Sequence, residues 1–262
     1  MADRQEVNEG WERFLTGKEN LLKIAQPMFR KLPKSPRCVL CYAPFKGPFT
    51  WPLKLMAKDP WPRNPNVCRF CGYWLRNKGP GGAHVELTLL FADIRGSTQL
   101  AETLPPDEYV DLINRFYESA TDAFVRHGAI IDQLVGDEAI GLFLPGFVGQ
   151  DHVAIAYQAA TDLLAATGHG GGGDPWVPVG IGVHTGTAFV GSVGSEQNFT
   201  EFTAVGDSVN TTARLASKAD MGEVVISSTA VEGSSIDPTG MRRESFDLKG
   251  KAESYSVYVS SI

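Results

Sequence analysis

Two aspartates in separate apolar segments have the chemistry to hold a divalent cation. Asp93 ends the apolar run VELTLLFAD, and Asp137 lies at the tip of a predicted hairpin, in LVGDEAI. A carboxylate at the end of a buried strand usually faces a cation, a helix N-terminus or water, because burying it alone is costly. If the hairpin lies beside the first strand, the two carboxylates meet at one end of the sheet. Such a pair favours Mg²⁺ or Mn²⁺, although each aspartate taken singly also fits a turn.

A second group of polar residues is suited to binding phosphate. Asn210 and Arg214 are four residues apart in VGDSVNTTARL, a predicted helix, so both project from one face. Together they offer several donors and a fixed positive charge, which suits a phosphate whose charge grows in a transition state. Lys249, in DLKGKAES, precedes a glycine and is free to reach a phosphate. Each of these residues alone is equally typical of a polar surface.

The four cysteines form two CxxC pairs, Cys38 with Cys41 and Cys68 with Cys71. Two such pairs can complete a tetrahedral four-thiolate site, which most often holds structural Zn²⁺; an iron–sulfur cluster or thiol redox chemistry are the alternatives. A metal would also explain how a segment rich in Pro and Trp stays folded with few aliphatic residues. We expect three tryptophans of this segment to pack around the site: Trp51, Trp61 and Trp74.

Composition narrows the class of protein. The chain has 262 residues, 43% of them hydrophobic and 21% charged, which is typical of a folded globular protein and excludes a disordered or fibrous one. The net charge of −6 disfavours a duplex-DNA-binding surface, so no nucleic-acid partner is predicted. The sequence contains no apolar run long enough to span a membrane, and its first residues do not resemble a secretory signal. We therefore expect a cytoplasmic protein, where reduced cysteines favour a metal site.

Three regions differ in composition: an amphipathic helical segment over 1–36, the cysteine segment over 37–82, and alternating strands and helices over 83–262. The apolar stripe of the first region predicts a helix over 11–30 that packs on its own domain or pairs with its copy in a dimer.

Hairpins alternate with long helices in the last region, which predicts an α+β sandwich with helices on one face of a mostly antiparallel sheet. A hairpin is expected around Thr185 and Gly186, and Asp207 or Ser208 is expected to cap the helix that carries Asn210. The predicted strands are 85–93, 129–135, 138–144, 179–183, 188–193, 223–227, 243–248 and 254–259, and the predicted helices are 106–127, 151–167 and 207–218.

The order of the motifs resembles the class III nucleotidyl cyclase catalytic domain. FADIRGST, LVGDEAIGLF, GIGVHTG, GDSVNTTARLAS and LKG follow one another over residues 85–259. The resemblance implies a ferredoxin-like α/β sandwich that works as a head-to-tail homodimer with its active sites at the interface. It implies conversion of ATP to 3′,5′-cyclic AMP and pyrophosphate, with two Mg²⁺ or Mn²⁺ ions held by Asp93, Asp137 and the backbone carbonyl of Ile94. The cysteine segment resembles a zinc ribbon.

The same resemblance implies that the other subunit supplies Asn210 for the ribose, Arg214 for the α-phosphate and Lys249 for the terminal phosphates. The family's base-reading lysine and aspartate correspond to Gln133 and Thr203 here. Glutamine can donate or accept, and a hydroxyl can do both, so this pair has no strong repulsion against GTP. Thr203 favours ATP. A guanylate or mixed-specificity cyclase, and a catalytically weak nucleotide-binding regulatory module, are the alternatives.

Two further positions bear on the family pattern. Gly180 stands where many relatives carry an arginine before the GIGVHTG strand, so one auxiliary phosphate contact is expected to be missing. His184 is predicted to be a structural histidine and not a catalytic base.

Overall fold

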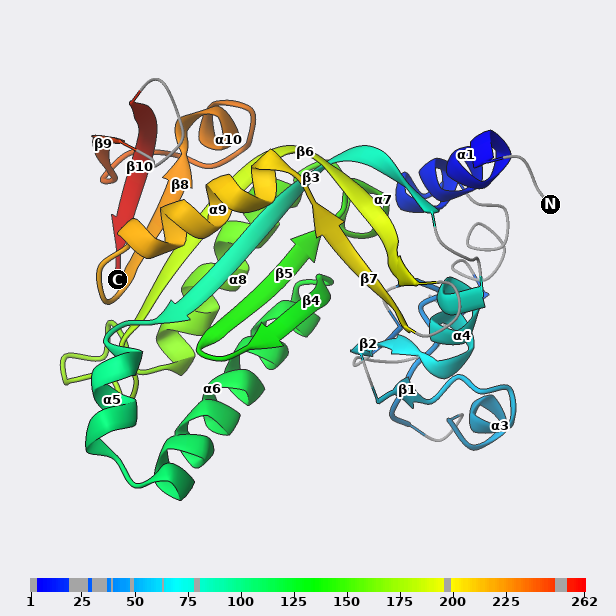
Figure 1. Ribbon diagram of the computed structural model, residues 1–262, viewed down its shortest axis with the longest axis horizontal. Coiled ribbons are helices and arrows are strands. Elements are labelled where there is room, and N and C mark those ends of the chain that lie inside the picture. The colour runs from blue at the N-terminus through cyan, green and yellow to red at the C-terminus, as the bar shows by residue number, and fades with distance from the viewer. Residues whose placement is uncertain are drawn as a thin grey trace.

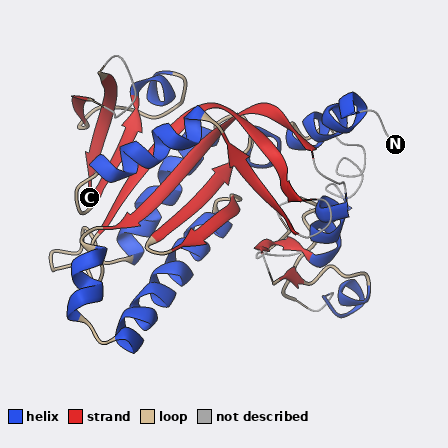
Figure 2. Cartoon of the chain, in the orientation of Figure 1, coloured by secondary structure: helices blue, strands red, loops and turns tan. Residues whose placement is uncertain are grey.

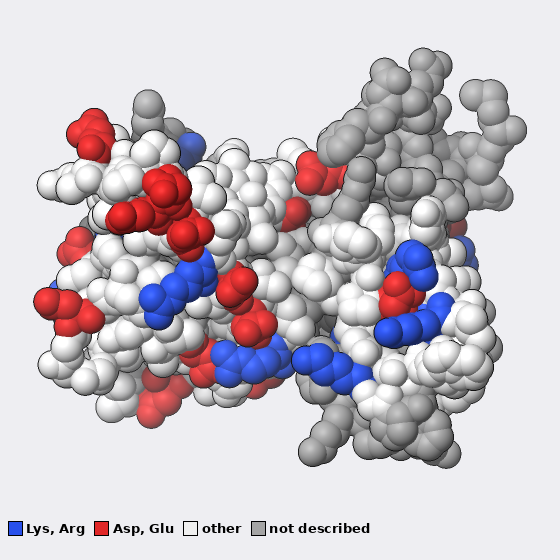
Figure 3. Space-filling view, turned by 90° about the horizontal axis from the view of Figure 1, so that it is seen from below, with Lys and Arg blue, Asp and Glu red and all other residues white. Residues whose placement is uncertain are grey.

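The computed structural model describes residues 4–18, 28–29, 37–38, 40–47, 50–62, 64–77, 81–195, 199–247 and 254–262. A large twisted sheet with helices on both faces forms one part of the molecule, and a smaller part that contains the cysteines lies beside it (Figure 1). Figure 2 shows the same division, with the long strands crossing the larger part. Acidic and basic side chains are interspersed over the face seen in Figure 3. Among the described helices, none has both the length and the apolar character that a membrane crossing requires.

The main sheet has eight strands in the order β4-β5-β3-β6-β8-β10-β9, with β7 paired to β6. Every pairing is antiparallel except β6 with β8, so the predicted, mostly antiparallel sheet is confirmed. The strands are β3 (Gly81–Ile94), β4 (Ile130–Val135), β5 (Glu138–Phe143), β6 (Val179–Ser195), β7 (Phe199–Val205), β8 (Glu223–Ser227), β9 (Arg242–Phe246) and β10 (Tyr255–Ser261).

Helices cover both faces of this sheet, which corrects the expectation that they lie on one face. The helices of this part are α5 (Ser97–Thr103), α6 (Pro106–Arg126), α7 (Pro145–Val148), α8 (His152–Ala166), α9 (Asp207–Lys218) and α10 (Ser228–Glu232). Alternate residues of β3 face opposite sides: Leu90 and Ala92 join the core beneath α6 and α8, whereas Leu87 and Leu89 join the core on the side of α9.

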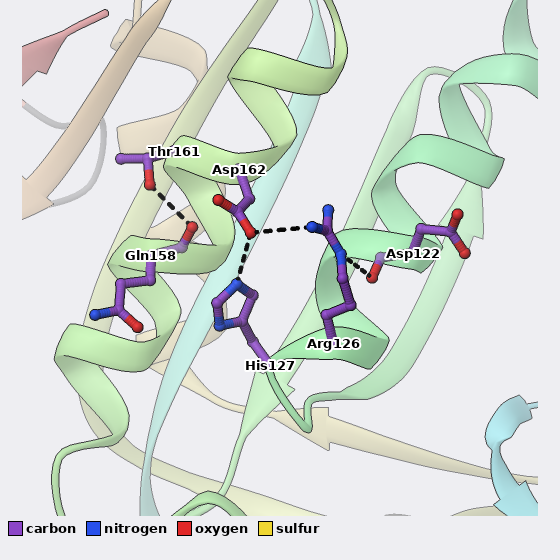
Figure 4. Close-up of polar contacts among 6 residues, drawn as sticks. All are labelled: Asp122, Arg126, His127, Gln158, Thr161 and Asp162. Atoms are coloured by element: carbon purple, nitrogen blue, oxygen red, sulfur yellow. Dashed lines mark hydrogen bonds and ion pairs between the residues drawn. The ribbon is translucent and has the colours of Figure 1, made fainter. Parts of the chain in front are cut away.

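The layer of α6 and α8 is fixed at one end by a shared carboxylate. Asp162 of α8 accepts from His127 Nε2 at 3.0 Å and pairs with Arg126 at 3.3 Å, and both partners stand at the end of α6 (Figure 4). The two helices therefore form a firm support beneath β3, β5 and β6.

The hairpin predicted around Thr185 and Gly186 is wrong, because β6 runs without interruption from Val179 to Ser195. It pairs with β3 along the whole length of that strand, and the hydroxyls of Thr88 and Thr185 lie 2.8 Å apart. Gly186 is small for another reason: a Cβ there would lie 2.5 Å from Ser208 Oγ of α9. Gly186 therefore allows α9 to lie close to β6, and it is not part of a turn.

The helix predicted over 11–30 is also different in the structure. Helix α1 (Arg4–Leu15) begins earlier and ends at Leu15. Gly17 adopts a left-handed φ of 72°, and the amides of Gly17 and Lys18 donate to the carbonyls of Phe14 and Arg13, which is a Schellman ending. Most of the remaining predicted helix lies outside the described residues.

Helix α1 packs within its own chain. Trp11, Phe14 and Leu15 are buried, and the Trp11 ring stacks on Phe202 of β7 with centroids 6.0 Å apart. Phe14 contacts Trp74 of the cysteine part, at 4.9 Å between centroids. Helix α1 thus joins the two parts of the molecule.

The cysteine part consists of short elements that lie against the main sheet. Its β1–β2 hairpin approaches β4, and α4 approaches β7 (Figure 1). The elements are α3 (Thr50–Leu55), β1 (Pro60–Trp61), β2 (Asn64–Cys68) and α4 (Arg69–Asn77).

Candidate active site

The two predicted metal-binding aspartates meet at one end of the main sheet. Asp93 lies near the end of β3, opposite Glu138 of β5, and Asp137 occupies the turn before β5. The Ile94 amide donates to the Asp137 carbonyl at 3.1 Å, so the backbones of the two segments are directly joined. The predicted juxtaposition is confirmed, and it arises because β5 pairs with β3 in the expected antiparallel register.

A guanidinium lies within this acidic group. Arg95 forms an ion pair with Asp93, whose side chain is 19% exposed. Burial lowers the pKa of Arg95, while the charges of Asp137, Glu138 and Asp220 act in the opposite direction. Sequence reasoning missed Arg95, although it directly follows the predicted ligands in FADIRGST.

The acidic group is suited to cations. Burial raises the pKa of Glu138, and the neighbouring charge of Asp137 raises it further, with Arg95 lowering it. This group contains the carboxylates of Asp93, Asp137 and Glu138 and one guanidinium, that of Arg95. Hard oxygen ligands at a partly buried sheet end match the preference of Mg²⁺ and Mn²⁺, so the residues present fit such an ion.

Helix α9 lies very close to β6 because three glycines leave room for it. A Cβ at Gly180 would lie 2.6 Å from the Ala219 carbonyl oxygen, and one at Gly182 would lie 2.7 Å from the Thr212 carbonyl oxygen. The close approach at Gly180 leaves no room for a side chain there. Along β6, Ser208 stands above Gly186 at one end of the helix and Ala219 above Gly180 at the other.

Gly206 occupies the N-cap position of α9, so neither Asp207 nor Ser208 stands at the predicted cap. The Ser208 hydroxyl donates to the Thr187 carbonyl at 2.8 Å. That bond fixes the first turn of α9 to β6, which sets the position of Asn210 and Arg214, two and six residues after Ser208.

Asn210 and Arg214 share the face of the sheet toward which Asp93 alternates, yet they do not contact the acidic end. Within the described part of the chain, no hydrogen bond or ion pair joins either residue to Asp93 or Asp137. The acidic sheet end and the Asn210–Arg214 face of α9 are therefore two separate groups of polar residues in the described chain. Lys249 lies outside the described residues.

The two residues predicted to read the base are on neighbouring strands. Gln133 lies on β4 and Thr203 on β7, and these strands approach each other without pairing. A cleft of about 520 Å³ opens here, lined by Gln133 and Glu201 and, from the cysteine part, by Pro62 and Pro65.

Asp132, which sequence reasoning missed, lies beside this pair. Burial raises its pKa to about 7, against hydrogen bonds from the Thr203 side chain and the Ala204 backbone that lower it. Its signal was present in the sequence as an acid inside the apolar segment IIDQLV.

The four cysteines form one buried cluster. The Sγ atoms of Cys38, Cys41, Cys68 and Cys71 all lie within 4.8 Å of one another, and Cys41 and Cys68 are 3.7 Å apart. A tetrahedral zinc–thiolate site with bonds of about 2.3 Å has sulfur–sulfur edges of about 3.8 Å. The cluster therefore has the dimensions of a single four-coordinate ion.

A backbone amide and an ammonium beside the cluster can stabilise thiolates. The Cys68 amide lies 3.2 Å from Cys38 Sγ, and the buried Lys58 ammonium lies 3.9 Å from Cys41 Sγ. Hydrogen bonds from the other cysteines lower the pKa of Cys41, whereas burial raises the pKa of Cys38. Lys58 was not identified from the sequence, since it belongs to neither CxxC pair.

The three tryptophans behave differently from one another. Trp51 is 73% exposed, so its predicted packing around the cluster is wrong. The Trp61 ring lies over Gly72, next to Cys71. Trp74 contacts Phe14 of α1 and packs against the buried core that contains the four cysteines.

His184 is buried and Nδ1 lies 2.9 Å from the Ser227 hydroxyl. The prediction of a structural histidine is confirmed.

Comparison with known proteins adds the family. The model of the adenylate and guanylate cyclase catalytic domain matches residues 82–261. An adenylate cyclase of Anabaena cylindrica is 32% identical over 181 residues, which are 66% of this chain and 36% of that protein. An uncharacterized protein of Mycobacterium tuberculosis is 33% identical over 162 residues, 59% of this chain and 28% of that protein. The chain thus matches only about a third of the length of these relatives.

Two solved structures share the fold. The guanylyl cyclase Cya2 superposes with a TM-score of 0.62 at 30% identity, over 69% of this chain and 93% of that one. The adenylyl cyclase CyaB from P. aeruginosa superposes with a TM-score of 0.57 at 24% identity, over 67% of this chain and 93% of that one. The predicted ferredoxin-like α/β sandwich of a nucleotidyl cyclase is confirmed.

Proposed function

The chain belongs to the adenylate and guanylate cyclase family through its catalytic domain, and on this premise we propose that it converts ATP to 3′,5′-cyclic AMP and pyrophosphate as a homodimer. The observation that carries the proposal is the meeting of Asp93 and Asp137 at one sheet end, joined through the Ile94 amide. The domain thus belongs to a cyclase family and has two carboxylates placed where the metal ions of the reaction would bind.

Asp93, Asp137 and the carbonyl of Ile94 would hold two Mg²⁺ or Mn²⁺ ions. When bound, these ions would lower the pKa of the ribose 3′-hydroxyl and neutralise charge on the triphosphate. Arg95 pairs with Asp93 in the structure, so a divalent ion bound to that carboxylate would compete with the Arg95 guanidinium.

The other half-site consists of Asn210 and Arg214 on α9, with Lys249. Asn210 would orient the ribose and Lys249 would hold the terminal phosphates. Arg214 would donate to the α-phosphate as its charge grows during in-line displacement, an interaction of the kind whose loss costs roughly 10²- to 10³-fold in kcat. No nucleophile from the protein is required, because the attacking group is the ribose hydroxyl of the substrate.

Two observations favour a site shared between two copies. No hydrogen bond or ion pair joins Asn210 or Arg214 to Asp93 or Asp137 within the described chain. In addition, Val135 beside the acidic turn and Val205 at the end of β7 are 58% and 49% exposed. Strand β4 leads to the acidic turn and strand β7 leads into α9. Exposed apolar side chains on these strands are suited to burial against a second copy.

The choice of ATP rests on Gln133 and Thr203. Adenine presents an amino group at position 6, and guanine presents a carbonyl. A Thr203 hydroxyl that accepts would bind the amino group, while Gln133 can rotate its amide to suit either purine. Relatives named as adenylate and as guanylyl cyclases both resemble the chain, so the nucleotide must be tested directly.

We propose separately that the cysteine cluster holds structural Zn²⁺. The mutual approach of four sulfurs within 4.8 Å fits one ion, whereas an iron–sulfur cluster places several irons and sulfides between its thiolates. The charge of Lys58 would offset part of the negative charge of a four-thiolate site.

A paired assay tests the reaction and the nucleotide. Purified full-length protein with Mn²⁺ should release cyclic AMP from ATP, with a lower kcat/KM for GTP. Equal or greater efficiency with GTP would reverse the assignment of nucleotide. Tight nucleotide binding without either cyclic product would favour the regulatory-module alternative.

A mixing experiment tests the shared site. Asp93→Ala and Arg214→Ala proteins should each be inactive, because every homodimer loses the same half of both sites. Mixed dimers retain one site with all its groups, so combining the two proteins should restore up to about a quarter of wild-type activity if subunits exchange at random. Mixtures of two Asp93→Ala preparations are the matched control. Exchange of subunits without any recovery of activity would contradict the interface model.

A further inference from the structure

The cysteine part exposes apolar side chains on its short helix α3. The two most exposed large apolar side chains of the described chain, Leu55 at 77% and Trp51 at 73%, both belong to this helix. They are four residues apart, so they share one face of it. Figure 1 shows α3 at the outer edge of the cysteine part, away from the main sheet. These side chains therefore project into solvent instead of packing on the catalytic domain.

The second CxxC pair adds an aromatic side chain to this surface. Phe70 lies between Cys68 and Cys71 and is exposed, and its amide donates to the Ala57 carbonyl at 2.7 Å. This backbone bond places Phe70 next to the end of α3, where Met56 is also exposed. We call the resulting surface the α3 patch, and it consists of Trp51, Leu55, Met56 and Phe70.

The same part of the chain is strongly basic. Residues 37–77 contain seven lysines and arginines and a single acidic residue, although the whole chain has a net charge of −6. A four-thiolate site with Zn²⁺ would add two negative charges, so this part stays positive with the metal bound. Lys54 is exposed on α3 itself. The amide and the hydroxyl of Thr50 donate to the Gly47 carbonyl, which holds the exposed Lys46 near the start of the same helix.

The α3 patch is held in shape by the core of the cysteine part. The buried Lys58 ammonium lies 3.9 Å from the centre of the Phe70 ring and 3.9 Å from Cys41 Sγ. The Arg69 amide donates to the Asp59 carbonyl, and its side chain pairs with the Asp59 carboxylate at 2.8 Å. The patch is therefore formed in the free protein, and no segment has to fold for it to bind.

The chemistry of the α3 patch favours an anionic lipid surface as its partner. Tryptophan lies at the boundary between lipid headgroups and acyl chains, leucine and phenylalanine insert beside it, and lysines are attracted to anionic headgroups. A nucleic acid would use the aromatic rings and the charges but would leave Leu55 and Met56 in water. A patch of four side chains exposes on the order of a few hundred Å², less than the about 800 Å² per partner of a stable interface between two copies.

We propose that the α3 patch is a membrane-docking surface that binds the cysteine part to anionic phospholipid bilayers. Trp51 and Leu55 would insert at the headgroup boundary, and Lys46 and Lys54 would contact the phosphates. The inference goes beyond the proposed cyclase reaction and does not depend on it, since none of these residues belongs to the proposed active site.

Flotation of the full-length protein with lipid vesicles tests the proposal. Vesicles of phosphatidylcholine with about 30% phosphatidylserine should bind at least about tenfold more tightly than phosphatidylcholine alone, and added salt should weaken the binding. The double variant Trp51→Ala and Leu55→Ala should lose at least about tenfold in binding to the anionic vesicles, with native circular dichroism. The double variant Val110→Ala and Met221→Ala is the matched control, since it removes exposed apolar side chains of the catalytic domain, and its binding should be unchanged.

A fluorescence measurement identifies the side chain that enters the bilayer. Anionic vesicles with brominated acyl chains should quench part of the tryptophan fluorescence of the wild type. Trp51→Phe keeps an aromatic ring and should still float with the vesicles, but the quenching should be lost. Quenching that persists in Trp51→Phe would show that another part of the chain inserts, and would overturn the inference.

Three other results would also overturn it. The first is the absence of flotation with anionic vesicles, or flotation that the Trp51→Ala and Leu55→Ala variant does not weaken. The second is binding of single-stranded RNA, without binding of vesicles, that this variant abolishes, which would assign the α3 patch to a nucleic acid. The third is self-association in sedimentation equilibrium that the same variant abolishes while vesicles do not bind, which would assign the patch to a second copy of the chain.

Discussion

The position of α9 over β6 can be tested by adding a single methyl group. In Gly182→Ala, the new Cβ would lie 2.7 Å from the Thr212 carbonyl oxygen and closer still to the Ala216 nitrogen, where ordinary contact begins at 3.4 Å. These are backbone atoms that cannot rotate away as a side chain can, so α9 must move away from β6 by about 1 Å. Asn210 and Arg214 move with the helix. Since a displacement of about 1 Å can cost about 10²-fold in rate, we expect kcat to fall roughly ten- to a hundredfold.

The assay should separate the motion of α9 from loss of fold. Overpacking of this kind costs about 1–3 kcal/mol, so Tm should fall by several degrees while circular dichroism stays native. Mn²⁺ binding at Asp93 and Asp137 should be unchanged, because those residues do not lie on α9. Gly173→Ala is the matched control, since its Cβ would meet nothing within 4 Å. A folded Gly182→Ala protein with kcat within twofold of wild type would refute the assignment of the phosphate-binding half-site to α9.

Three further perturbations address other parts of the molecule. Cys68→Ser should lower bound zinc, measured by elemental mass spectrometry, from about one ion per chain to a small fraction, and should lower Tm because metal binding and folding of this part are coupled. Arg95→Ala should tighten Mn²⁺ binding severalfold in an equilibrium titration, because it removes the cation that pairs with Asp93. Asp132→Asn should raise the free energy of unfolding at pH 8 by up to about 4 kcal/mol, the value of a pKa shift from 3.8 to about 7. Its advantage should shrink as pH falls from about 7 to about 4, because unfolding of the wild type releases a proton within that window.

Each of these has an outcome that contradicts it. Zinc-free wild-type protein with an unchanged Tm and freely titratable thiols would rule out the structural zinc site. Weaker or unchanged Mn²⁺ binding in Arg95→Ala, against Arg69→Ala as a control for loss of one ion pair, would show that Arg95 supports the site instead of competing for it. A stability difference between Asp132→Asn and wild type that does not vary with pH would show that the buried carboxyl is not the source.

Local pattern was sufficient to predict the elements whose signals are periodic. The run that ends at Asp93 is continuous and apolar because β3 is covered on both faces, and the turn at Asp137 follows from Gly136. The meeting of the two aspartates required only that the hairpin pair with the first strand. These are short-range or nearest-neighbour features, and sequence carries them well.

Features that depend on distant parts of the chain were missed or misjudged. Gly186 was taken as a turn residue because sequence alone cannot distinguish a bend from the close approach of a helix. The bulge at Asp132 and the pairing of Arg95 with Asp93 depend on neighbouring strands and side chains that local patterns do not specify. Gly17 gave a local signal for the end of α1, but the apolar stripe beyond it outweighed that signal.

The cysteine part is connected to helix α9 through strand β7. Helix α4 lies against β7, the Trp11 ring of α1 stacks on Phe202 of the same strand, and β7 continues through the single residue Gly206 into α9. Strand β7 is held by these contacts at one end and leads into α9 at the other, so a change in the contacts can shift the start of α9. Loss of order around the thiols would weaken the contacts of α4 with β7. The first turn of α9 is the part of the catalytic domain whose position would then change. Binding of a metal at the cysteine cluster would in this way affect the position of the residues on α9.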